Sequence, residues 1–413
     1  MSRTSFASMV STFRSVVRFR RFSWSATERR LARAASVADL RRIAKRRLPA
    51  GVFDYIDGGA EDELTLRRNR AAFARIEFRP RVLRDVSRVD PSVSLLGRTL
   101  PIPLVLAPTG STRIAHPQGE LAVARAAARA GLPYTLSTLG NRSIEEVARE
   151  NDGPHWFQLY VWEDRGLAKE LIQRAQAAGY EALVLTLDTI VFGRRDRDVR
   201  RGFTLPPRIG LDTIVEGILH PAWTWNLLRS EPIVFANVTG RGVEGGAPVS
   251  VTDYGHEPFD ASFSWPDVEW IRSIWDGPVV LKGIQTVEDA ELALEAGVET
   301  IAVSNHGGRQ LDGAPPALEV LPRVVEAVGG RAEILCDGGV RRGSDIVKAV
   351  ALGATAAMAG RAYLYGLGAA GEAGVDHVLR MLDDDVRRTM ALCGVASTDE
   401  LTPDLVRWRR SGS

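Results

Sequence analysis

The fold is decided by a stretch at residues 300–312, which reads TIAVSNHGGRQLD. Its first four residues are apolar or β-branched, as in a buried strand, and the polar residues begin where that strand would end. His306 is therefore expected at the C-terminal edge of a strand. The glycines after it let the backbone pass close to a ligand, and Arg309 is near enough to enter the same pocket as the imidazole. For an isolated pair, a loop histidine and a solvated arginine would be the simpler interpretation, so the surrounding sequence must decide.

Seven other apolar runs of similar length occur, and helix-like segments rich in alanine and charged residues separate most of them. The eight runs are 103–107, 133–136, 155–159, 182–187, 278–281, 300–303, 332–336 and 355–359. Eight buried strands alternating with helices are typical of an α/β fold, the (β/α)8 or TIM barrel. A doubly wound sheet is the alternative, but it rarely has eight such units, and no Gly-x-Gly-x-x-Gly opens the first one.

The remaining boundaries follow from helix signals and loop length. Two helices are expected before the barrel, the first with Ser36 as its N-cap and the second ending at Gly58. The barrel domain is thus expected to span residues 36–413. A loop after the fourth strand is far longer than usual between barrel elements, and residues 205–265 are interpreted as a lid or insert within it.

Small or hydrogen-bonding residues follow every apolar run. They are Pro108-Thr109-Gly110, Ser137, Gln158 and Tyr160, Thr186 and Asp188, Lys282-Gly283, Ser304 and His306, Asp337-Gly338-Gly339-Val340-Arg341, and Gly360-Arg361. Active sites of such barrels lie at the C-terminal ends of the strands, so these residues predict a polar mouth lined for a large cofactor.

The last two strand ends predict a phosphate site. Glycines there admit a phosphate to loop N–H groups, and Arg361 supplies positive charge. A phosphate site does not name the cofactor, but a buried Lys282 would stabilise the negative charge of a reduced flavin ring. A lysine reaching solvent from a strand end is the alternative.

Composition narrows the class of protein. The chain has 413 residues, of which 45% are hydrophobic and 25% charged, as in a globular protein with a large core. A net charge of +2 gives no reason to expect nucleic acid as a partner. Cys336 and Cys393 cannot form a disulfide framework, which favours a reducing, cytoplasmic compartment.

The first 35 residues differ from the remainder, with eight arginines, one acidic residue and interspersed aromatics. They contain neither an uninterrupted apolar signal region nor a membrane-spanning stretch of about 20 apolar residues. A disordered tail is expected. The alternative is a basic amphipathic segment on an anionic membrane, which would place the protein peripherally on the inner face of the cell membrane.

Residues 304–312 resemble the active-site signature of the FMN-dependent α-hydroxy-acid dehydrogenases and oxidases. The similarity runs from about Ser36 to the C-terminal end and is strongest to the actinobacterial L-lactate dehydrogenases in this family. The resemblance implies FMN as cofactor. It places these residues at the ring and ribityl chain: Pro108, Thr109, Gly110, Ser137, Gln158, Thr186, Lys282 and Ser304. It places these at the ribityl and phosphate end: Asp337, Gly338, Gly339, Arg341, Gly360 and Arg361.

The resemblance also implies the chemistry of the site. Oxidation of a 2-hydroxy acid needs a base, a cationic clamp for the carboxylate and an electron acceptor. His306 would be the base, and Asp188 would stabilise its imidazolium form. The clamp would consist of Arg309 and Arg195. Two tyrosines, Tyr55 and Tyr160, would hydrogen-bond the substrate's carboxylate and hydroxyl. Whether the base takes the Cα or the hydroxyl proton is left open.

Two positions favour a dehydrogenase over an oxidase. Leu139 stands where glycolate oxidase has tryptophan, and Gly110 where it has alanine. The function expected is oxidation of L-lactate to pyruvate, with electrons passed to a quinone or other acceptor. The long loop, with Trp223 and Trp225 expected to be exposed, is interpreted as a lid or as a surface touching membrane or quinone.

Three other functions stay open. One is an oxidase of the glycolate or mandelate type that uses O2. A second is a barrel of the IMP dehydrogenase or isopentenyl isomerase kind, although the chain lacks a loop cysteine for it. The third is a non-catalytic flavoprotein scaffold. No metal is expected, and the assembly expected is a homotetramer or homo-octamer.

Overall fold

The computed structural model describes residues 24–201, 211–238 and 259–409, together with residues 11, 13, 15 and 16. Most of the expected N-terminal tail and part of the expected lid at residues 205–265 lie outside these ranges.

Eight parallel strands form a closed barrel, which confirms the expected fold. The strands are β4 (Leu104–Leu106), β5 (Tyr134–Ser137), β6 (His155–Leu159), β7 (Ala182–Thr186), β8 (Val279–Ile284), β9 (Thr300–Val303), β10 (Glu333–Cys336) and β11 (Ala356–Ala359). Each lies on one of the predicted apolar runs. The barrel closes because β11 pairs with β4, where Met358 lies opposite Val105.

Alternate side chains of the barrel strands pack into two separate hydrophobic cores. Val105, Val184 and Val280 pack in the barrel interior with Met358. Leu104 and the other outward-facing strand residues pack under the surrounding helices. A hairpin of β2 (Val93–Leu95) and β3 (Arg98–Leu100) adds apolar side chains to the interior core. Burial on both faces is why the strands appear in the sequence as continuous apolar runs.

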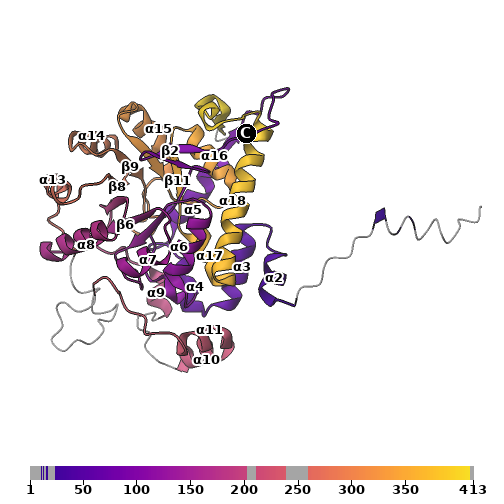
Figure 1. The fold of residues 1–413 in the computed structure, drawn as a ribbon, viewed down its shortest axis with the longest axis vertical. Helices are drawn as coiled ribbons and strands as arrows, with labels where there is room; N and C mark the ends of the chain where they lie inside the picture. Colours follow the sequence, from indigo (N-terminus) through magenta and orange to yellow (C-terminus); the bar gives the residue numbers. More distant parts are fainter. Residues whose placement is uncertain are drawn as a thin grey trace, which may run out of the picture.

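Helices surround the barrel (Figure 1). They are α6 (Gly119–Arg129), α7 (Ile144–Glu150), α8 (Arg165–Ala177), α13 (Trp265–Ile274), α14 (Val287–Glu295), α15 (Ala317–Val328), α16 (Gly343–Ala351), α17 (Arg361–Ala370) and α18 (Glu372–Cys393). Short 3-10 helices span Thr112–Ile114, Thr398–Glu400 and Pro403–Leu405.

Within residues 24–103, four helices precede the barrel: α2 (Ala26–Leu31), α3 (Val37–Arg47), α4 (Ala50–Asp57) and α5 (Leu64–Arg75). Ser36 caps α3 as expected, since its hydroxyl accepts a hydrogen bond from the Asp39 N–H. Helix α2 packs against α17 and α18, with Leu31 and Ala34 buried. The folded part therefore begins upstream of the boundary expected between residues 35 and 36. Strand β1 (Ile76–Phe78) pairs antiparallel with β12 (Val406–Trp408) near the C-terminal end.

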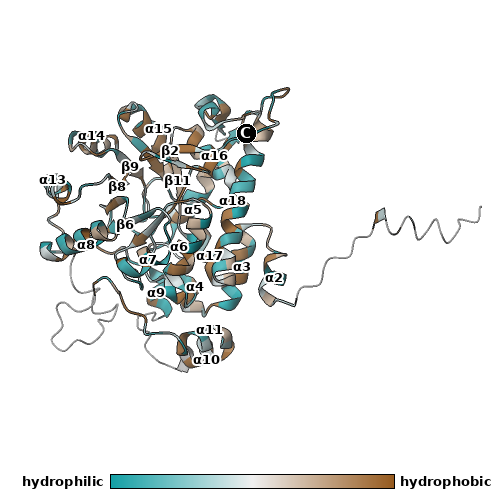
Figure 2. Ribbon diagram, viewed as in Figure 1, coloured by the Kyte–Doolittle hydropathy of each residue, from teal (hydrophilic) through white to brown (hydrophobic). Residues whose placement is uncertain are grey.

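The long segment between β7 and β8 contains α9 (Asp196–Arg201), α10 (Leu211–Leu219) and α11 (Pro221–Leu228) ahead of α13. Helices α10 and α11 lie at the lower edge of the molecule in Figure 1, and Figure 2 shows hydrophobic residues on both. The expectation that two tryptophans are exposed holds for Trp225, which is 55% exposed. It is wrong for Trp223, which is half-buried because its indole N–H donates to the Ile114 carbonyl at 2.8 Å.

Candidate active site

A cavity lies at the C-terminal ends of the barrel strands, with about 1070 Å³ of space that protein atoms do not fill, part of it open to solvent. Seventeen of the predicted site residues line it: Tyr55, Pro108, Thr109, Gly110, Ser137, Leu139, Tyr160, Arg195, Lys282, His306, Arg309, Asp337, Gly338, Gly339, Arg341, Gly360 and Arg361. The structure thus brings together residues from both ends of the chain.

Four predicted residues lie behind the cavity lining. The Ser137 hydroxyl donates to Gln158 Oε1 at 2.9 Å, and Ser304 accepts from the Lys282 ammonium at 3.0 Å. Thr186 lines a neighbouring pocket beside α13. Asp188 supports His306 and does not itself line the cavity.

The backbone after β9 turns sharply to present His306. His306 has a left-handed φ of 56°, and Gly307 and Gly308 follow with φ of 62° and 75°. A Cβ on Gly308 would lie 2.6 Å from the Leu66 nitrogen, so only glycine fits there. The turn therefore explains both glycines of the motif.

The imidazole of His306 is held by a carboxylate. Its Nδ1 lies 3.0 Å from Asp188 Oδ1, and because an ionised carboxylate only accepts, Nδ1 carries the proton and Nε2 is left for a ligand. Burial raises the pKa of Asp188, but the charges of His306 and Lys282 more than offset this and hold the pKa below its usual value. The pair can therefore take up a proton at Nε2 and stabilise it.

Lys282 is buried beneath the cavity, with an exposed fraction of 3%. Its ammonium lies 3.4 Å from Asp337 Oδ2. Burial lowers the pKa of Lys282, but Asp337 and Asp188 outweigh it and the pKa is raised overall. The lysine is thus a fixed positive charge, which excludes the alternative of a side chain reaching solvent.

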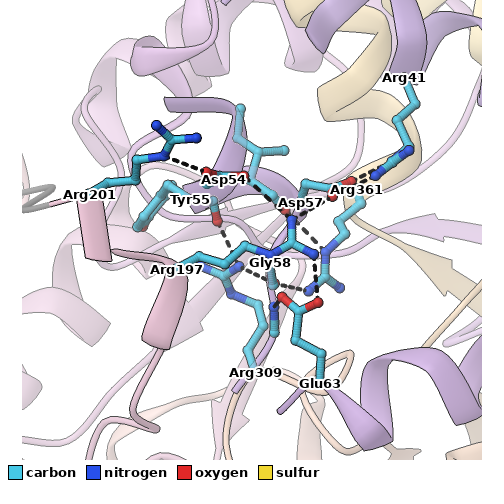
Figure 3. A network of polar contacts seen from close by, with 12 residues as sticks. Arg41, Asp54, Tyr55, Asp57, Gly58, Glu63, Arg197, Arg201, Arg309 and Arg361 are labelled. Carbon is cyan, nitrogen blue, oxygen red and sulfur yellow. Dashed lines mark hydrogen bonds and ion pairs between the residues drawn. The ribbon is translucent and has the colours of Figure 1, made fainter. Parts of the chain in front are cut away.

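Three arginines, Arg195, Arg309 and Arg361, converge beside α4, and Figure 3 shows the last two of them. Arg309 donates to the carbonyls of Tyr55 and Gly58 at 2.8 and 3.1 Å. Arg361 also donates to the Gly58 carbonyl, to the Ile56 carbonyl in α4 and to the Gly307 carbonyl in the loop after β9. The guanidinium groups of Arg195 and Arg309 lie 5.1 and 5.2 Å from the centre of the Tyr55 ring.

Two of these cations, Arg309 and Arg361, form no ion pair with a carboxylate among the described residues, whereas Arg195 pairs with Asp198. Burial, and then repulsion from Arg195 and Arg361, lowers the pKa of Arg309 to about 9. The partners that the described residues provide to Arg309 and Arg361 are backbone carbonyls. A bound anion would relieve this repulsion, so the arrangement favours a carboxylate or a phosphate at this end of the cavity.

Sequence reasoning missed several residues of the site. Phe192 lines the cavity, and its ring lies 4.8 Å from that of Phe259, which in turn packs on Tyr160 at 5.0 Å. Asp198 pairs with Arg195 at 3.2 Å. Phe192 and Asp198 each lie three residues from Arg195 in the sequence, so proximity to this predicted clamp residue was the available signal.

The family model described as FMN-dependent dehydrogenase matches residues 44–408, and the chain belongs to this family. The family that the motifs resembled is thereby confirmed. FMN is therefore the cofactor.

Several individual relatives are similar to this chain over most of its length. A Mycobacterium tuberculosis protein, whose name gives L-lactate dehydrogenase as a provisional assignment, is 46% identical over 399 residues, covering 96% of this chain and 95% of its own. The L-lactate dehydrogenase of Alcaligenes faecalis is 44% identical, with 90% and 98% covered. The solved monotopic membrane protein (S)-mandelate dehydrogenase has a TM-score of 0.86 at 41% identity, with 91% of this chain and all of that one covered. The expected similarity to actinobacterial L-lactate dehydrogenases is confirmed.

The cavity fits FMN. Three buried polar atoms have no hydrogen-bond partner among the described residues: Asp337 Oδ1 in the cavity wall, and Gln158 Nε2 and Thr186 Oγ1 behind the lining. Buried polar atoms normally have partners, and a flavin ring and ribityl chain carry the matching donors and acceptors. At the other end, a Cβ on Gly339 would lie 2.8 Å from the Asn69 carbonyl, so the backbone there needs glycine, and α17 begins at Gly360 with its N-terminus available to a phosphate.

Proposed function

We propose that the protein oxidises a small L-2-hydroxy acid, with L-lactate as the main substrate, and passes the electrons from FMN to a quinone. The observation that carries this proposal is the placement of the His306–Asp188 pair and of Arg195 and Arg309 around one cavity. The names of the bacterial relatives support L-lactate.

In this proposal each residue has one role. His306 Nε2 takes a proton from the substrate, and Asp188 stabilises the resulting imidazolium. Arg309 and Arg195 hold the carboxylate, while Tyr55 donates a hydrogen bond to it. Burial raises the pKa of Tyr160, which keeps its hydroxyl a donor for the substrate oxygen. FMN, when bound, accepts the two electrons that the substrate loses.

The positions that favour a dehydrogenase are in contact with each other. A Cβ on Gly110 would lie 3.1 Å from the Leu139 Cβ and 3.3 Å from its carbonyl oxygen. An alanine at 110 would therefore press on Leu139, so the two residues set the shape of this wall together. We infer that this wall faces the substrate side chain.

Leu139→Trp is expected to change which substrate is used best. An indole is much larger than an isobutyl group, so it should narrow the cavity and disfavour larger side chains relative to glycolate. The kcat/KM values for glycolate, L-lactate and (S)-mandelate in both proteins measure this, and we expect the ratio of L-lactate to glycolate to fall by about tenfold. An unchanged ranking would show that Leu139 does not face the substrate.

An aromatic L-2-hydroxy acid is the second candidate substrate. Phe192 places an aromatic surface at the cavity, and Phe259 and Tyr160 extend it. Such rings stabilise a phenyl group by edge or offset contacts. The solved relatives that are named for mandelate agree with this candidate. A kcat/KM for (S)-mandelate above that for L-lactate in the unchanged protein would favour it.

We also propose that α10 and α11 rest on a membrane surface. Their exposed apolar side chains are Ile214, Val215, Ile218, Leu219, Trp225 and Leu228. No helix among the described residues is long and apolar enough to cross a membrane. Glu216 ties α10 to the barrel by accepting from the Ala50 N–H at 3.0 Å. An apolar face fixed in this way suits shallow insertion at a lipid surface, and a solved relative is described as monotopic.

Replacing Ile218 and Leu228 together by glutamate is expected to abolish flotation with anionic liposomes while L-lactate oxidation with a soluble dye persists. Both side chains are more than two-thirds exposed, so the change should leave the fold intact. Leu392→Glu is the matched control, because Leu392 is equally exposed on α18. Equal flotation of both variants would contradict the proposal. A smaller assembly by light scattering, with flotation unchanged, would show instead that a second copy covers this face.

A further inference from the structure

Helix α9 begins directly after the cavity-lining Arg195, yet none of its own side chains is buried. Its neighbour is α4, the helix that carries Tyr55. Burial of apolar area cannot hold α9 in place, so its position depends on polar contacts. These contacts therefore decide where Arg195 lies.

Arg197 makes three of the four ion pairs that join α9 to α4 and the following turn among the described residues. Its guanidinium lies 3.0 Å from Asp57 Oδ2 and 2.6 Å from Glu63 Oε2, and it approaches Asp54 at 3.5 Å. Arg201 adds a contact of 3.2 Å to Asp54. Figure 3 shows both arginines reaching from α9 toward the carboxylates of α4 and the following turn.

Asp57 is the fixed point of this network. It is 5% exposed, and its two oxygens accept from Arg41 at 2.5 and 2.7 Å, from the Tyr365 hydroxyl at 2.7 Å and from Arg197 at 3.0 Å. Burial raises the pKa of this carboxyl, but the hydrogen bonds from Arg41, Tyr365 and Arg197 lower it to about 2. Asp57 is thus a permanently charged anchor that joins α3, α4, α9 and α17.

The same turn shapes the anion end of the cavity. Asp57 is the last residue of α4, and Gly58 follows it and accepts hydrogen bonds from Arg309 and Arg361. Glu63 also holds this turn, because its other oxygen accepts from the Gly59 N–H at 3.0 Å. One bridge of charges therefore links α9 to the turn that orients two of the converging arginines.

We propose that Arg197 is a positioning residue for the substrate carboxylate, acting through its bridge to Asp57 and Glu63. Neither Arg197 nor Asp57 is among the described residues that line the cavity. The bridge fixes α9, and α9 fixes Arg195, so loss of the bridge weakens substrate binding without removing any group that touches substrate. This inference rests on the proposed function, in which Arg195 holds the carboxylate.

Arg197→Gln is expected to raise the KM for L-lactate about tenfold while kcat changes less than about threefold, because binding is lost before chemistry. Arg200→Gln is the matched control. Arg200 lies on the same helix and carries the same charge, but its ion-pair partner is Asp196 on α9 itself, and its side chain is 69% exposed. We expect its KM to match that of the unchanged protein.

A double-mutant cycle separates the bridge from a general charge effect. Glu63→Gln alone should raise KM. The double variant Arg197→Gln with Glu63→Gln should raise KM hardly more than the larger of the two single changes, because each single change already breaks the same contact. Independent, multiplying effects would overturn the proposed bridge. Equal KM values for the Arg197 and Arg200 variants would overturn it as well.

Trypsin gives a readout that needs no turnover. Trypsin can cleave after Arg194 and Arg195, which directly precede α9. The cleavage rate depends on the fraction of molecules in which this segment is open. In the FMN-loaded protein, mass spectrometry should find faster cleavage after these two residues in Arg197→Gln than in Arg200→Gln. Equal cleavage rates would refute the inference. An inactive but trypsin-resistant unchanged protein would instead count against the proposed substrate.

Discussion

His306→Gln leaves FMN bound and slows the reduction of the flavin by substrate by about 10²- to 10⁴-fold, the usual contribution of a general base. The expectation follows from geometry: Nδ1 is bound by Asp188, and Nε2 is the nitrogen left to take a proton. Glutamine keeps a polar side chain of similar reach but has no basic nitrogen. Rapid mixing under anaerobic conditions measures the rate, and absorbance of the purified variant measures the bound flavin.

His377→Gln provides the comparison for this substitution. His377 lies on α18, where its ring contacts the Ala34 carbonyl at 2.8 Å, away from the cavity. Its loss should leave flavin reduction unchanged. If the His306 variant also stayed within a few-fold of the unchanged protein, another group would be the base. Loss of FMN from the His306 variant would show that the imidazole supports the cofactor as well.

The barrel could be predicted from sequence because its strands are buried on both faces. Such strands appear as unbroken apolar runs, and the same rule that places active sites at their C-terminal ends located most of the site. His306 follows β9, and Lys282 lies in β8 directly after the expected apolar run, so their common position needed only the fold. The strand boundaries in the structure differ from the expected ones at some positions, as at β8, which extends to Ile284.

Contacts between distant segments could not be predicted in this way. The bridge from Arg197 to Asp57 joins residues 140 positions apart, and no periodic pattern marks an ion pair of this kind. The burial of Trp223 depends on one carbonyl, that of Ile114, presented by another loop. Helix α2 lies in a segment whose composition suggested disorder, and its burial against α17 and α18 outweighed that signal. Tertiary packing decided each of these cases.

The arginines also show why charge in a site must be counted in three dimensions. In sequence, Arg195, Arg309 and Arg361 lie far apart; the first two are expected to form one clamp for the carboxylate, and the third is expected at the phosphate. In the structure they converge, and burial together with repulsion from Arg195 and Arg361 lowers the pKa of Arg309. At neutral pH the guanidinium remains charged, so the site attracts an anion instead of releasing a proton.

The second large effect expected of this site is a difference in reaction rate between the two enantiomers of the substrate. In the proposed function, the arginines beside Tyr55 hold the carboxylate at one point, the His306–Asp188 pair holds the proton acceptor at another, and FMN would lie at the strand ends. Three fixed points accept one enantiomer of a 2-hydroxy acid with its Cα–H aligned for reaction. The other enantiomer must misplace a group, which costs on the order of 10²-fold or more in rate.

Anaerobic mixing of the FMN-loaded protein with L-lactate and, separately, with D-lactate tests this chemistry most directly. We expect L-lactate to bleach the flavin absorbance with formation of pyruvate. We expect D-lactate to bleach it at a rate at least about 10²-fold lower. Glycolate and (S)-mandelate, measured alongside, set the substrate range. Flavin that no L-2-hydroxy acid bleaches, or that both enantiomers of lactate bleach equally fast, would contradict the proposed function.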